Sequence, residues 1–324
     1  MNDIHLVIRT TGERTASVAK KLAIVSGLVE NEVTVVNEIP FEVALRACYE
    51  EAIRVGRKWT MTLDADVLLA DTAVRRLLGL AEQMPSHFFQ IEGKVFDKIT
   101  GIYRQAGHRI YRTELLPLAL EHIPAAGAQI RPEFHTITQM VELGYPSRVV
   151  PSLVGVHDFE QYYADLYRKS LVHARKHSEL LPNVIARCSR LLPRDDDFLV
   201  ILKGIWDGLL MQEALTIDVR RYEDQAACAM QSLGLAEKQP IVDSDGFVKM
   251  FPRFFSDIRS LYPTPDGAVW DHLPALSESG TKPERVQRSW LAKTVGRIRE
   301  RGAIRGSVAA FGALLRLAGQ RLER

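Results

Sequence analysis

The sequence has few cysteines, no long apolar run and no N-terminal signal pattern, and each shortage excludes a class of protein. Only three cysteines occur in 324 residues, with no CxxC and no Cys/His pair at metal-ligand spacing. Sparse cysteines predict reduced thiols and a cytoplasmic protein. Asp3, His5 and Arg9 interrupt the N-terminus where a signal peptide is apolar. No stretch approaches about 18 uncharged apolar residues, so we expect no bilayer-spanning segment.

Charge is unevenly distributed along a chain of otherwise ordinary composition. Apolar residues make up 46% and charged residues 25%, which is typical of a globular protein with material for a sizeable core. From Lys282 to Arg324 there are 11 Lys/Arg against 3 Asp/Glu, a net charge of +8, while the other 281 residues carry 31 against 37, a net charge of −6. A basic tail on a mildly acidic body predicts an anionic partner for the tail.

The first part of the chain alternates strand-like and helix-like patterns. Strand, helix, strand, helix, strand with short connections predicts an α/β fold, with a mostly parallel sheet flanked by helices. In such sheets ligands bind beyond the carboxyl ends of the strands. The predicted strands are Ile4–Ile8, Glu32–Val36 and Trp59–Leu63, and the predicted helices span about 15–27, 41–55 and 71–83.

The pattern divides the chain into four parts. Residues 1–178 form the predicted α/β core, and residues 179–238 a helical extension. Residues 239–282, rich in Pro, Gly, Ser and Asp, are predicted to be loop or linker. In residues 283–324, apolar side chains recur with helical spacing among basic ones, which predicts an amphipathic helical tail.

Two carboxylates, Asp64 and Asp66, stand one residue apart at the end of the third predicted strand. Unpaired carboxylates in a turn repel each other, and a divalent cation relieves that repulsion. Oxygen ligands suit Mg²⁺ or Mn²⁺, which proteins commonly bind with one or two carboxylates plus substrate phosphates. The alternative is that one of the two caps the following helix.

Three segments together resemble a known family. IRTTGERT follows the first strand, NEIPFE precedes the second helix, and KWTMTLDADVLL contains the D-x-D sequence. Over roughly residues 4–175 the chain resembles nucleotide-sugar glycosyltransferases of the GT-A fold, bacterial glycosyltransferase family 2 in particular. The resemblance implies that Asp64 and Asp66 bind Mn²⁺ or Mg²⁺, which holds the donor diphosphate.

The resemblance also implies a catalytic base and a third metal ligand. Glu133, in RPEFH before a helix that ends at Gly144-Tyr145, matches the family's base, although Pro132 replaces the first member of the usual acidic pair. The alternative is a helix N-terminal charge. His157 follows a strand where the family often places a ligand, and an imidazole suits Mn²⁺. The alternative for His157 is an ordinary loop or core histidine.

Donor-binding residues are implied at the first strand end and in a later loop. Arg9, Thr10 and Glu13 lie where these enzymes hold the nucleoside, with Asp64 beside the diphosphate. Arg109 falls in a loop that contacts donor or acceptor, and its planar guanidinium suits phosphate.

The basic tail predicts a peripheral membrane protein at the inner face of the membrane. A basic amphipathic helix with Trp290 at its start suits an anionic lipid surface. The alternative is a helix that packs on the body or on a second subunit. Nucleic acid is not expected, because aromatic residues are not interleaved with the basic ones.

The expected function is metal-dependent transfer of a sugar from a nucleotide-sugar donor to a glycan or lipid-linked acceptor hydroxyl. Inversion and a place in bacterial surface polysaccharide assembly are implied by the resemblance alone. One alternative is a catalytically degenerate GT-A domain that serves as a glycan-binding or scaffold module. Another is a haloacid-dehalogenase-like phosphatase, whose D-x-D-x-[TV] motif fits residues 64–67 but normally follows the first strand of its domain.

Overall fold

The computed structural model describes residues 3–262, and these fall into two compact units. Residues 3–168 and 213–262 belong to the unit that contains the sheet, and residues 169–212 to the other. In chain order the strands are β1 (Ile4–Arg9), β2 (Val33–Val36), β3 (Trp59–Asp64), β4 (Val67–Leu69), β5 (Gln90–Asp97), β6 (Tyr103–Arg104), β7 (His108–Arg112) and β8 (Ser147–His157).

Ten α-helices and four short 3-10 helices connect the strands and follow them in the described range. The α-helices are α1 (Ala16–Val25), α2 (Phe41–Val55), α3 (Ala73–Glu82), α4 (Leu116–Glu121), α5 (Pro132–Glu142), α6 (Tyr163–Lys176), α7 (Leu181–Leu191), α8 (Asp197–Leu210), α9 (Glu223–Leu233) and α10 (Ser244–Leu261). The 3-10 helices are η1 (Glu30–Glu32), η2 (Thr113–Leu115), η3 (Ser178–Leu180) and η4 (Val219–Tyr222).

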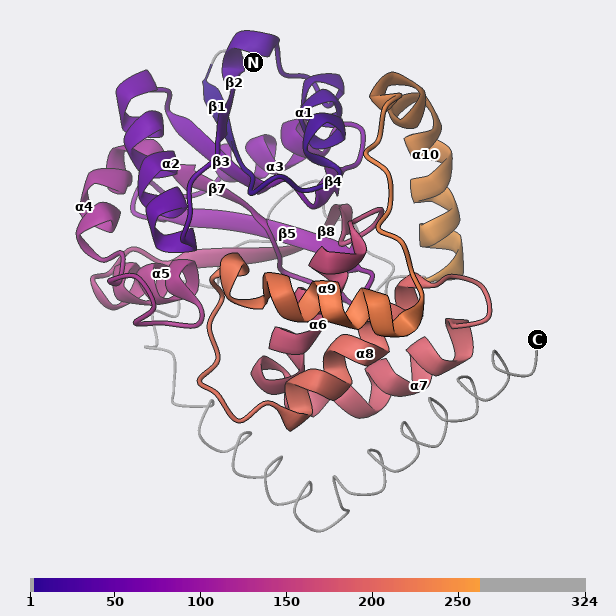
Figure 1. Cartoon of the computed structure of the whole chain (residues 1–324). Coiled ribbons are helices and arrows are strands. Elements are labelled where there is room, and N and C mark those ends of the chain that lie inside the picture. The colour runs from indigo at the N-terminus through magenta and orange to yellow at the C-terminus, as the bar shows by residue number, and fades with distance from the viewer. Residues whose placement is uncertain (1–2, 263–324) are drawn as a thin grey trace. The chain divides into compact units, whose positions relative to one another are not determined.

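The strands form one mixed sheet in the order β2-β1-β3-β7-β5-β8-β4, with β6 paired to β5 (Figure 1). β1 pairs in parallel with β2 and β3, as the predicted βαβ units require, and β5 pairs in parallel with β8. β7 runs antiparallel to β3 and β5, and β4 runs antiparallel to β8. The predicted α/β class is confirmed, and the antiparallel strands all come after the D-x-D turn.

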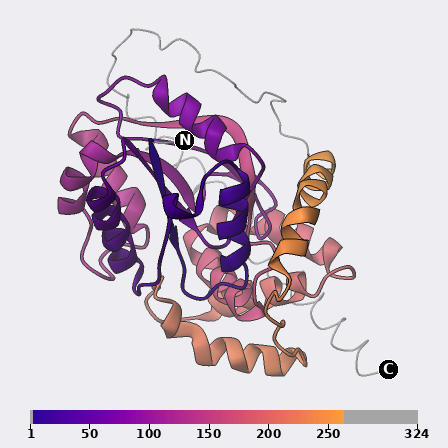
Figure 2. The ribbon, with the colours of Figure 1, turned by 90° about the horizontal axis from the view of Figure 1, so that it is seen from above.

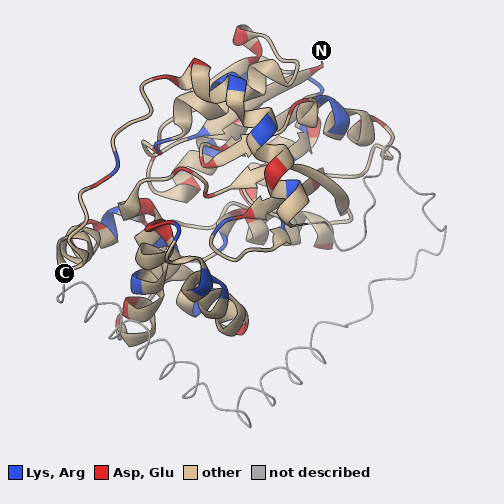
Figure 3. Ribbon diagram, turned by 90° about the vertical axis from the view of Figure 1, so that its right-hand side faces the viewer, with Lys and Arg blue, Asp and Glu red and all other residues tan. Residues whose placement is uncertain are grey.

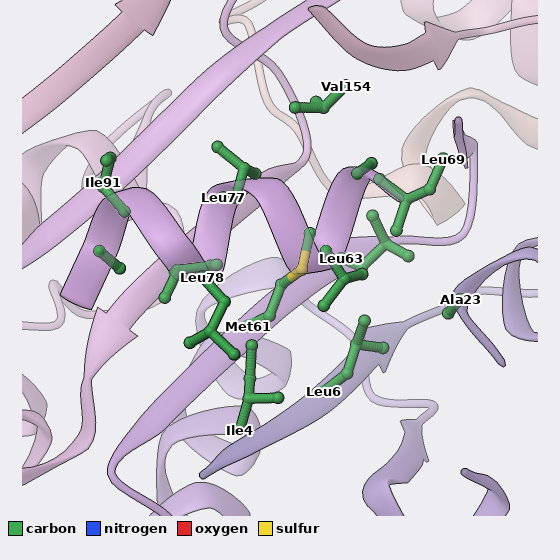
Figure 4. Close-up of a cluster of buried hydrophobic side chains, with 14 of the residues drawn as sticks. Ile4, Leu6, Ala23, Met61, Leu63, Leu69, Leu77, Leu78, Ile91 and Val154 are labelled. Atoms are coloured by element: carbon green, nitrogen blue, oxygen red, sulfur yellow. The ribbon is translucent and has the colours of Figure 1, made fainter. Parts of the chain in front are cut away.

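Helices cover both faces of the sheet, and strand residues alternate between two cores. Leu6 and Met61 belong to one core, where α3 supplies Leu77 and Leu78 (Figure 4). Val7 belongs to the other core, with residues of α2, α4 and α5. Figure 2, a view from above, shows α1 and α10 on one side of the first strands and α2 with α5 on the other.

Two helix boundaries illustrate what local signals can locate. α2 spans 41–55 as predicted, and Gly56 after it adopts φ 70°, the left-handed conformation in which many helices end. The next helix was predicted over about 71–83, whereas α3 begins at Ala73 after Thr72. Thr72 has φ 66°, so the left-handed turn before Ala73 delays the start of the helix.

The predicted linker is wrong over Ser244–Leu261, because this segment forms α10. The Asp243 side chain accepts a hydrogen bond from the Gly246 N–H at 2.8 Å, which caps the helix. α10 packs against α1, and its Phe251 and Ile258 are buried. The composition of residues 239–282 taken as a whole is typical of a loop, but apolar residues recur with helical spacing within Ser244–Leu261.

In the second unit, α7 packs against α8, and α8 lies close to the end of α6. A Cβ atom at Gly208 would lie 2.3 Å from the Leu171 carbonyl oxygen, so only glycine permits this approach. Helices α7, α8 and α9 occur where a helical extension was predicted, although α9 belongs to the unit with the sheet.

The predicted basic tail, residues 283–324, lies outside the described residues. Within the described part, acidic and basic segments are interspersed along the ribbon in the view of Figure 3. None of the helices found between residues 3 and 262 combines the length and the apolar character that crossing a membrane requires.

Candidate functional site

The carboxyl ends of β1, β3 and β8 bring the predicted site residues to one edge of the sheet. The β1–β3 register places Arg9 opposite Asp64. Short strand β4 follows the D-x-D turn and pairs with the end of β8, placing Val67 opposite His157. Residues 55 and 90 positions apart therefore meet at the edge where parallel strands present ligand sites.

The two D-x-D carboxylates face different partners. Asp64 Oδ1 accepts a hydrogen bond from Arg9 Nε at 2.7 Å, and the Asp64 side chain is 27% exposed. Asp66 is buried, and its Oδ1 lies 3.4 Å from Nε2 of His157. The pair predicted to bind one cation together is divided between an arginine and a histidine.

Asp66, His157 and Asp158 form a group of buried side chains whose ligand atoms lie within 4.8 Å of one another. We call these three residues the metal group. Asp66 and His157 were predicted ligands, whereas Asp64 is not part of the group. The prediction that Asp64 binds the metal directly stays a prediction.

The charge around His157 fits a cation. Burial by itself would lower the pKa of His157, but the Asp158 and Asp66 carboxylates outweigh it and hold that pKa well above the ordinary value. Positive charge is therefore favoured between these carboxylates, as a proton or as a metal ion. Two carboxylates and an imidazole are a donor set suited to Mn²⁺, and they would hold it through Asp66, His157 and Asp158.

Asp97, at the end of β5, was not predicted as a site residue. Its Oδ2 lies 2.8 Å from His157 Nδ1 and accepts a hydrogen bond from Arg104 Nη1 at 3.0 Å. Its Oδ1 accepts hydrogen bonds from the N–H and hydroxyl of Thr100, both at 2.7 Å. Asp158 Oδ2 lies 3.0 Å from the same His157 nitrogen, while Nε2 faces Asp66. Carboxylates at a ring nitrogen fix the orientation of metal-binding histidines, and Asp97 is placed to do this.

A second buried cluster surrounds Glu133 at the start of α5. We call it the Glu133 network. Arg9 donates to both carboxylate oxygens, with Nη1–Oε1 at 3.0 Å and Nη2–Oε2 at 3.3 Å. The Tyr111 hydroxyl donates to Oε1 at 2.8 Å, and Arg109 Nη1 donates to Oε2. Two guanidinium groups and a phenol therefore engage both oxygens.

These contacts determine how Glu133 holds a proton. Burial raises its pKa, but Arg109 and Arg9 lower it further than burial raises it, to about 2. A carboxylate with so low a pKa is a weak base, so this arrangement does not favour the predicted role in deprotonating the acceptor. It favours a positioning role, in which Glu133 holds Arg9 beside Asp64.

The arginines predicted to meet the donor point into this network. Arg9 is buried, and its guanidinium lies 4.7 Å from the centre of the Phe41 ring. Arg109 Nε lies 3.2 Å from Glu92 Oε2. Burial raises the pKa of Glu92 although Arg109 opposes the change. In the structure, Arg9 and Arg109 bind carboxylates of the chain, and their predicted donor contacts stay predictions.

The loop after β1 is closed by its own side chains. Glu13 Oε2 accepts hydrogen bonds from the Thr10 hydroxyl and the Thr11 N–H, each at 2.7 Å. Glu13 Oε1 accepts from the Thr11 hydroxyl at 2.9 Å. Glu13 therefore shapes the loop that was predicted to hold the nucleoside, and donor contacts from Thr10 and Glu13 stay predictions.

Asp97, Glu92 and Tyr111 are the site residues that the sequence-based reasoning missed. Asp97 could have been found, because it is a carboxylate at a strand end like Asp64. Glu92 and Tyr111 lie within strands, on the face that meets α5, and only the register of β5 and β7 places them beside Arg109 and Glu133.

Known structures similar to this chain include glycosyltransferases. The mannosyltransferase PcManGT from Pyrobaculum calidifontis, in complex with GDP-Man and Mn²⁺, is 14% identical over 80% of this chain and 83% of that chain, with a TM-score of 0.36. A glycosyltransferase involved in glycosylation of the major capsid of PBCV-1 is 11% identical over 48% of this chain and 92% of that chain, with a TM-score of 0.34.

A sugar-nucleotide synthetase is also similar. The CMP:2-keto-3-deoxy-manno-octonic acid synthetase complexed with CTP is 12% identical over 47% of this chain and 90% of that chain, with a TM-score of 0.32. No protein-family model and no curated protein matches the chain. Glycosyltransferases are the class that the sequence resembles. The metal, the substrate and the mechanism have to be inferred from the residues of the site.

Proposed function

We propose that this protein is a metal-dependent glycosyltransferase that takes a nucleotide-sugar donor and transfers the sugar to an acceptor hydroxyl. The metal group carries the proposal, because buried Asp66, His157 and Asp158 converge where strand ends present ligand sites. Such a group stabilises positive charge, and a sugar-nucleotide donor brings phosphate oxygens that complete the ligands of Mn²⁺ or Mg²⁺.

The reaction breaks the bond between the anomeric carbon and the diphosphate oxygen, forms a bond to the acceptor oxygen and releases the acceptor proton. A divalent cation, when bound, supplies positive charge to the leaving diphosphate. Asp66, His157 and Asp158 would hold that cation, and Asp97 would fix the His157 ring through its contact with Nδ1.

Asp64 and the loop from Thr10 to Glu13 form the proposed donor side. The Asp64 side chain is the more exposed of the two D-x-D carboxylates and is held by Arg9. Glu133 fixes Arg9 from the opposite side. Proton transfer to Glu133 would require Arg9 and Arg109 to move away first, so we assign Glu133 to positioning.

The acceptor is proposed to be a glycan or a lipid-linked glycan at the inner face of the membrane. The support is the sequence of residues 283–324, whose net basic charge and amphipathic spacing suit an anionic lipid surface. Flotation of the full chain with phosphatidylglycerol vesicles, compared with phosphatidylcholine vesicles, tests this part. Equal recovery with both lipids would contradict it.

A second candidate is a donor-binding module without transferase activity. The observation that favours it is the engagement of both Glu133 oxygens by Arg9, Arg109 and Tyr111, which removes the predicted base. Both candidates predict metal-dependent nucleotide binding. They differ in sugar release, which only the transferase shows.

The test is a thermal-shift panel of UDP, GDP, CDP and ADP on the full chain, with and without Mn²⁺. We expect one nucleotide to raise the Tm strongly with Mn²⁺ and much less with EDTA, because binding to the folded state alone stabilises it. Hydrolysis of the matching nucleotide-sugars then separates enzyme from binding module. The proposal is wrong if no nucleotide shows a metal-dependent shift.

A further inference from the structure

A chain of buried hydrogen bonds crosses from the loop after β8 to the D-x-D turn through the start of α1. Gln161 Nε2 donates to the Thr15 hydroxyl oxygen at 2.7 Å, and the Thr15 hydroxyl donates to the Ala65 carbonyl oxygen at 2.7 Å. Thr15 and Gln161 are both fully buried. We call this chain the Thr15–Gln161 strut.

The direction of each hydrogen bond in the strut is settled by its neighbours. Gln161 Nε2 also donates to the Phe159 carbonyl oxygen at 3.0 Å, and since a carbonyl only accepts, this atom must be the amide nitrogen. The Ala65 carbonyl also only accepts, so the single hydroxyl proton of Thr15 is directed to it. In both hydrogen bonds of the strut the donor is therefore defined: the Gln161 amide for the first and the Thr15 hydroxyl for the second.

Thr15 is placed where a threonine usually serves its own helix. It is the N-cap residue of α1, a position from which the side chain normally accepts from a helix N–H. Here the Thr15 side chain makes no cap hydrogen bond and reaches across to Ala65. The Thr15 hydroxyl therefore hydrogen-bonds to the D-x-D turn and does not cap the start of α1.

The two ends of the strut hold the two halves of the metal group. The Ala65 carbonyl belongs to the peptide that leads into Asp66, so its orientation sets the direction of that carboxylate. Ala65 is also held from its N–H, which donates to the Arg9 carbonyl at 2.9 Å. A peptide held at both polar groups has little freedom to turn.

The other end of the strut supports a strained loop. Asp158 has φ 63° and Glu160 has φ 57°, values that are unfavourable for non-glycine residues and persist only when the surroundings impose them. Gln161 holds the Phe159 carbonyl between them. Arg14 also donates to the Glu160 carbonyl at 3.1 Å, which ties this loop to the loop after β1 at the surface.

We infer that Thr15 and Gln161 are positioning residues for the proposed metal site, which they assemble by fixing the D-x-D turn against the loop after β8. The inference rests on the proposed function, because it assumes that the metal group binds a cation. Each residue acts through the backbone beside the metal group, Thr15 through the Ala65 carbonyl and Gln161 through the Phe159 carbonyl.

The test uses the full chain and measures Mn²⁺ binding from the electron paramagnetic resonance signal of the free ion. Thr15→Val keeps the shape of the side chain and removes the hydroxyl, whereas Thr15→Ser keeps the hydroxyl. Groups that orient metal ligands cost about 10-fold to 100-fold in affinity when lost, so we expect Thr15→Val to weaken Mn²⁺ binding by about 10-fold. Thr15→Ser should restore it to within about twofold of the wild type.

Thr60→Val is the matched control for loss of a buried hydroxyl. Thr60 Oγ1 hydrogen-bonds to Thr113 Oγ1 at 2.7 Å near the start of β3, at the end of the strand opposite the D-x-D turn. Its Tm should fall as in Thr15→Val, while its Mn²⁺ affinity stays within about twofold of the wild type.

The outcomes separate the inference from the proposed function. Wild-type Mn²⁺ affinity in Thr15→Val, whatever its Tm, overturns the inference and leaves the proposed metal site intact. Absence of Mn²⁺ binding in the wild type overturns both. Gln161→Met should weaken binding like Thr15→Val, and the double variant should weaken it no further, because both changes break one strut. Full additivity would show two separate effects and would also overturn the inference.

Discussion

The metal group and the Glu133 network lie at the same edge of the sheet, yet they balance charge differently. Around His157 converge the carboxylates of Asp66, Asp97 and Asp158, and Arg104 pairs with one of them. Three carboxylates thus surround one imidazole, and those of Asp158 and Asp66 favour a positive charge there, as a proton or as a metal ion.

The Glu133 network contains its own counter-ions. Both oxygens of Glu133 face guanidinium groups, Arg109 also pairs with Glu92 and Arg9 with Asp64, and Tyr111 adds a neutral donor. A buried carboxylate satisfied in this way needs no ligand. The difference teaches that the kind of side chain facing a buried carboxylate matters more than its burial: guanidinium groups hold Glu133, whereas an imidazole stands among the carboxylates of the metal group.

Glu133→Gln should produce the largest effect on stability. The substitution leaves Arg9 and Arg109 buried with half of their compensation, and removing one partner of a buried ion pair costs about 3 to 5 kcal/mol. We expect the free energy of unfolding, measured by urea denaturation, to fall by about that amount.

The matched control is Glu142→Gln on the same helix. Glu142 is exposed, so its substitution should change the free energy of unfolding by no more than about 0.5 kcal/mol. Equal effects of the two substitutions would show that the Glu133 network contributes little, and the comparison between the clusters would fail.

Asp66→Asn should produce the largest effect on metal binding. The substitution removes a proposed ligand. Loss of a ligand should lower the affinity more than loss of a group that only orients a ligand, so we expect Mn²⁺ affinity to fall by more than about 100-fold. Calorimetry of the full chain measures this. Asp71→Asn, at an exposed position just after the turn, is the control and should bind as the wild type does.

Glu133→Gln also tests whether the metal group and the Glu133 network are separate in function. If they are, the folded variant binds Mn²⁺ with nearly wild-type affinity. A loss as large as that of Asp66→Asn would join Glu133 to the metal site.

The order of elements explains which parts of this site were predictable. Period-2 apolar patterns placed Asp64 and Asp66 at a strand end, and the strand-like segment before His157 placed that histidine at another. Parallel strands must present such ends at one edge, so proximity followed from local patterns. Glu133 was identified instead from the resemblance to the family, by its place before a helix that ends at Gly144.

Partners were not predictable, because they depend on register and long-range packing. Arg9 and Glu133 are separated by 124 positions, and their pairing converts an expected base into a carboxylate with a pKa of about 2. The contact of Asp97 with His157, in the same way, depends on the pairing of β5 with β8. Side-chain direction at a strand end is set by such neighbours, and a single sequence carries no signal for them.

Asp97→Asn should weaken Mn²⁺ binding by about 10-fold, less than Asp66→Asn does. Asp97 would act through Nδ1 of His157, and partners that orient a metal-binding histidine contribute about 10-fold to 100-fold to affinity. The free Mn²⁺ signal of the folded variant measures this. Unchanged affinity with a lowered Tm would assign Asp97 to stability alone.

The smallest predicted effect is a change in stability with pH, and it is specific to Glu133. The pKa of Glu133 is lowered from an ordinary 4.5 to about 2 in the folded protein, so the stability it contributes is fully present above pH 4.5. That stability is lost progressively as the pH falls from 4.5 to the folded value. The gap in free energy of unfolding between wild type and Glu133→Gln should therefore narrow by about 1 kcal/mol between pH 4.5 and 3.5. A gap that stays constant over this interval would mean that Glu133 is not held as a buried anion, and the contrast with the metal group would lose its electrostatic basis.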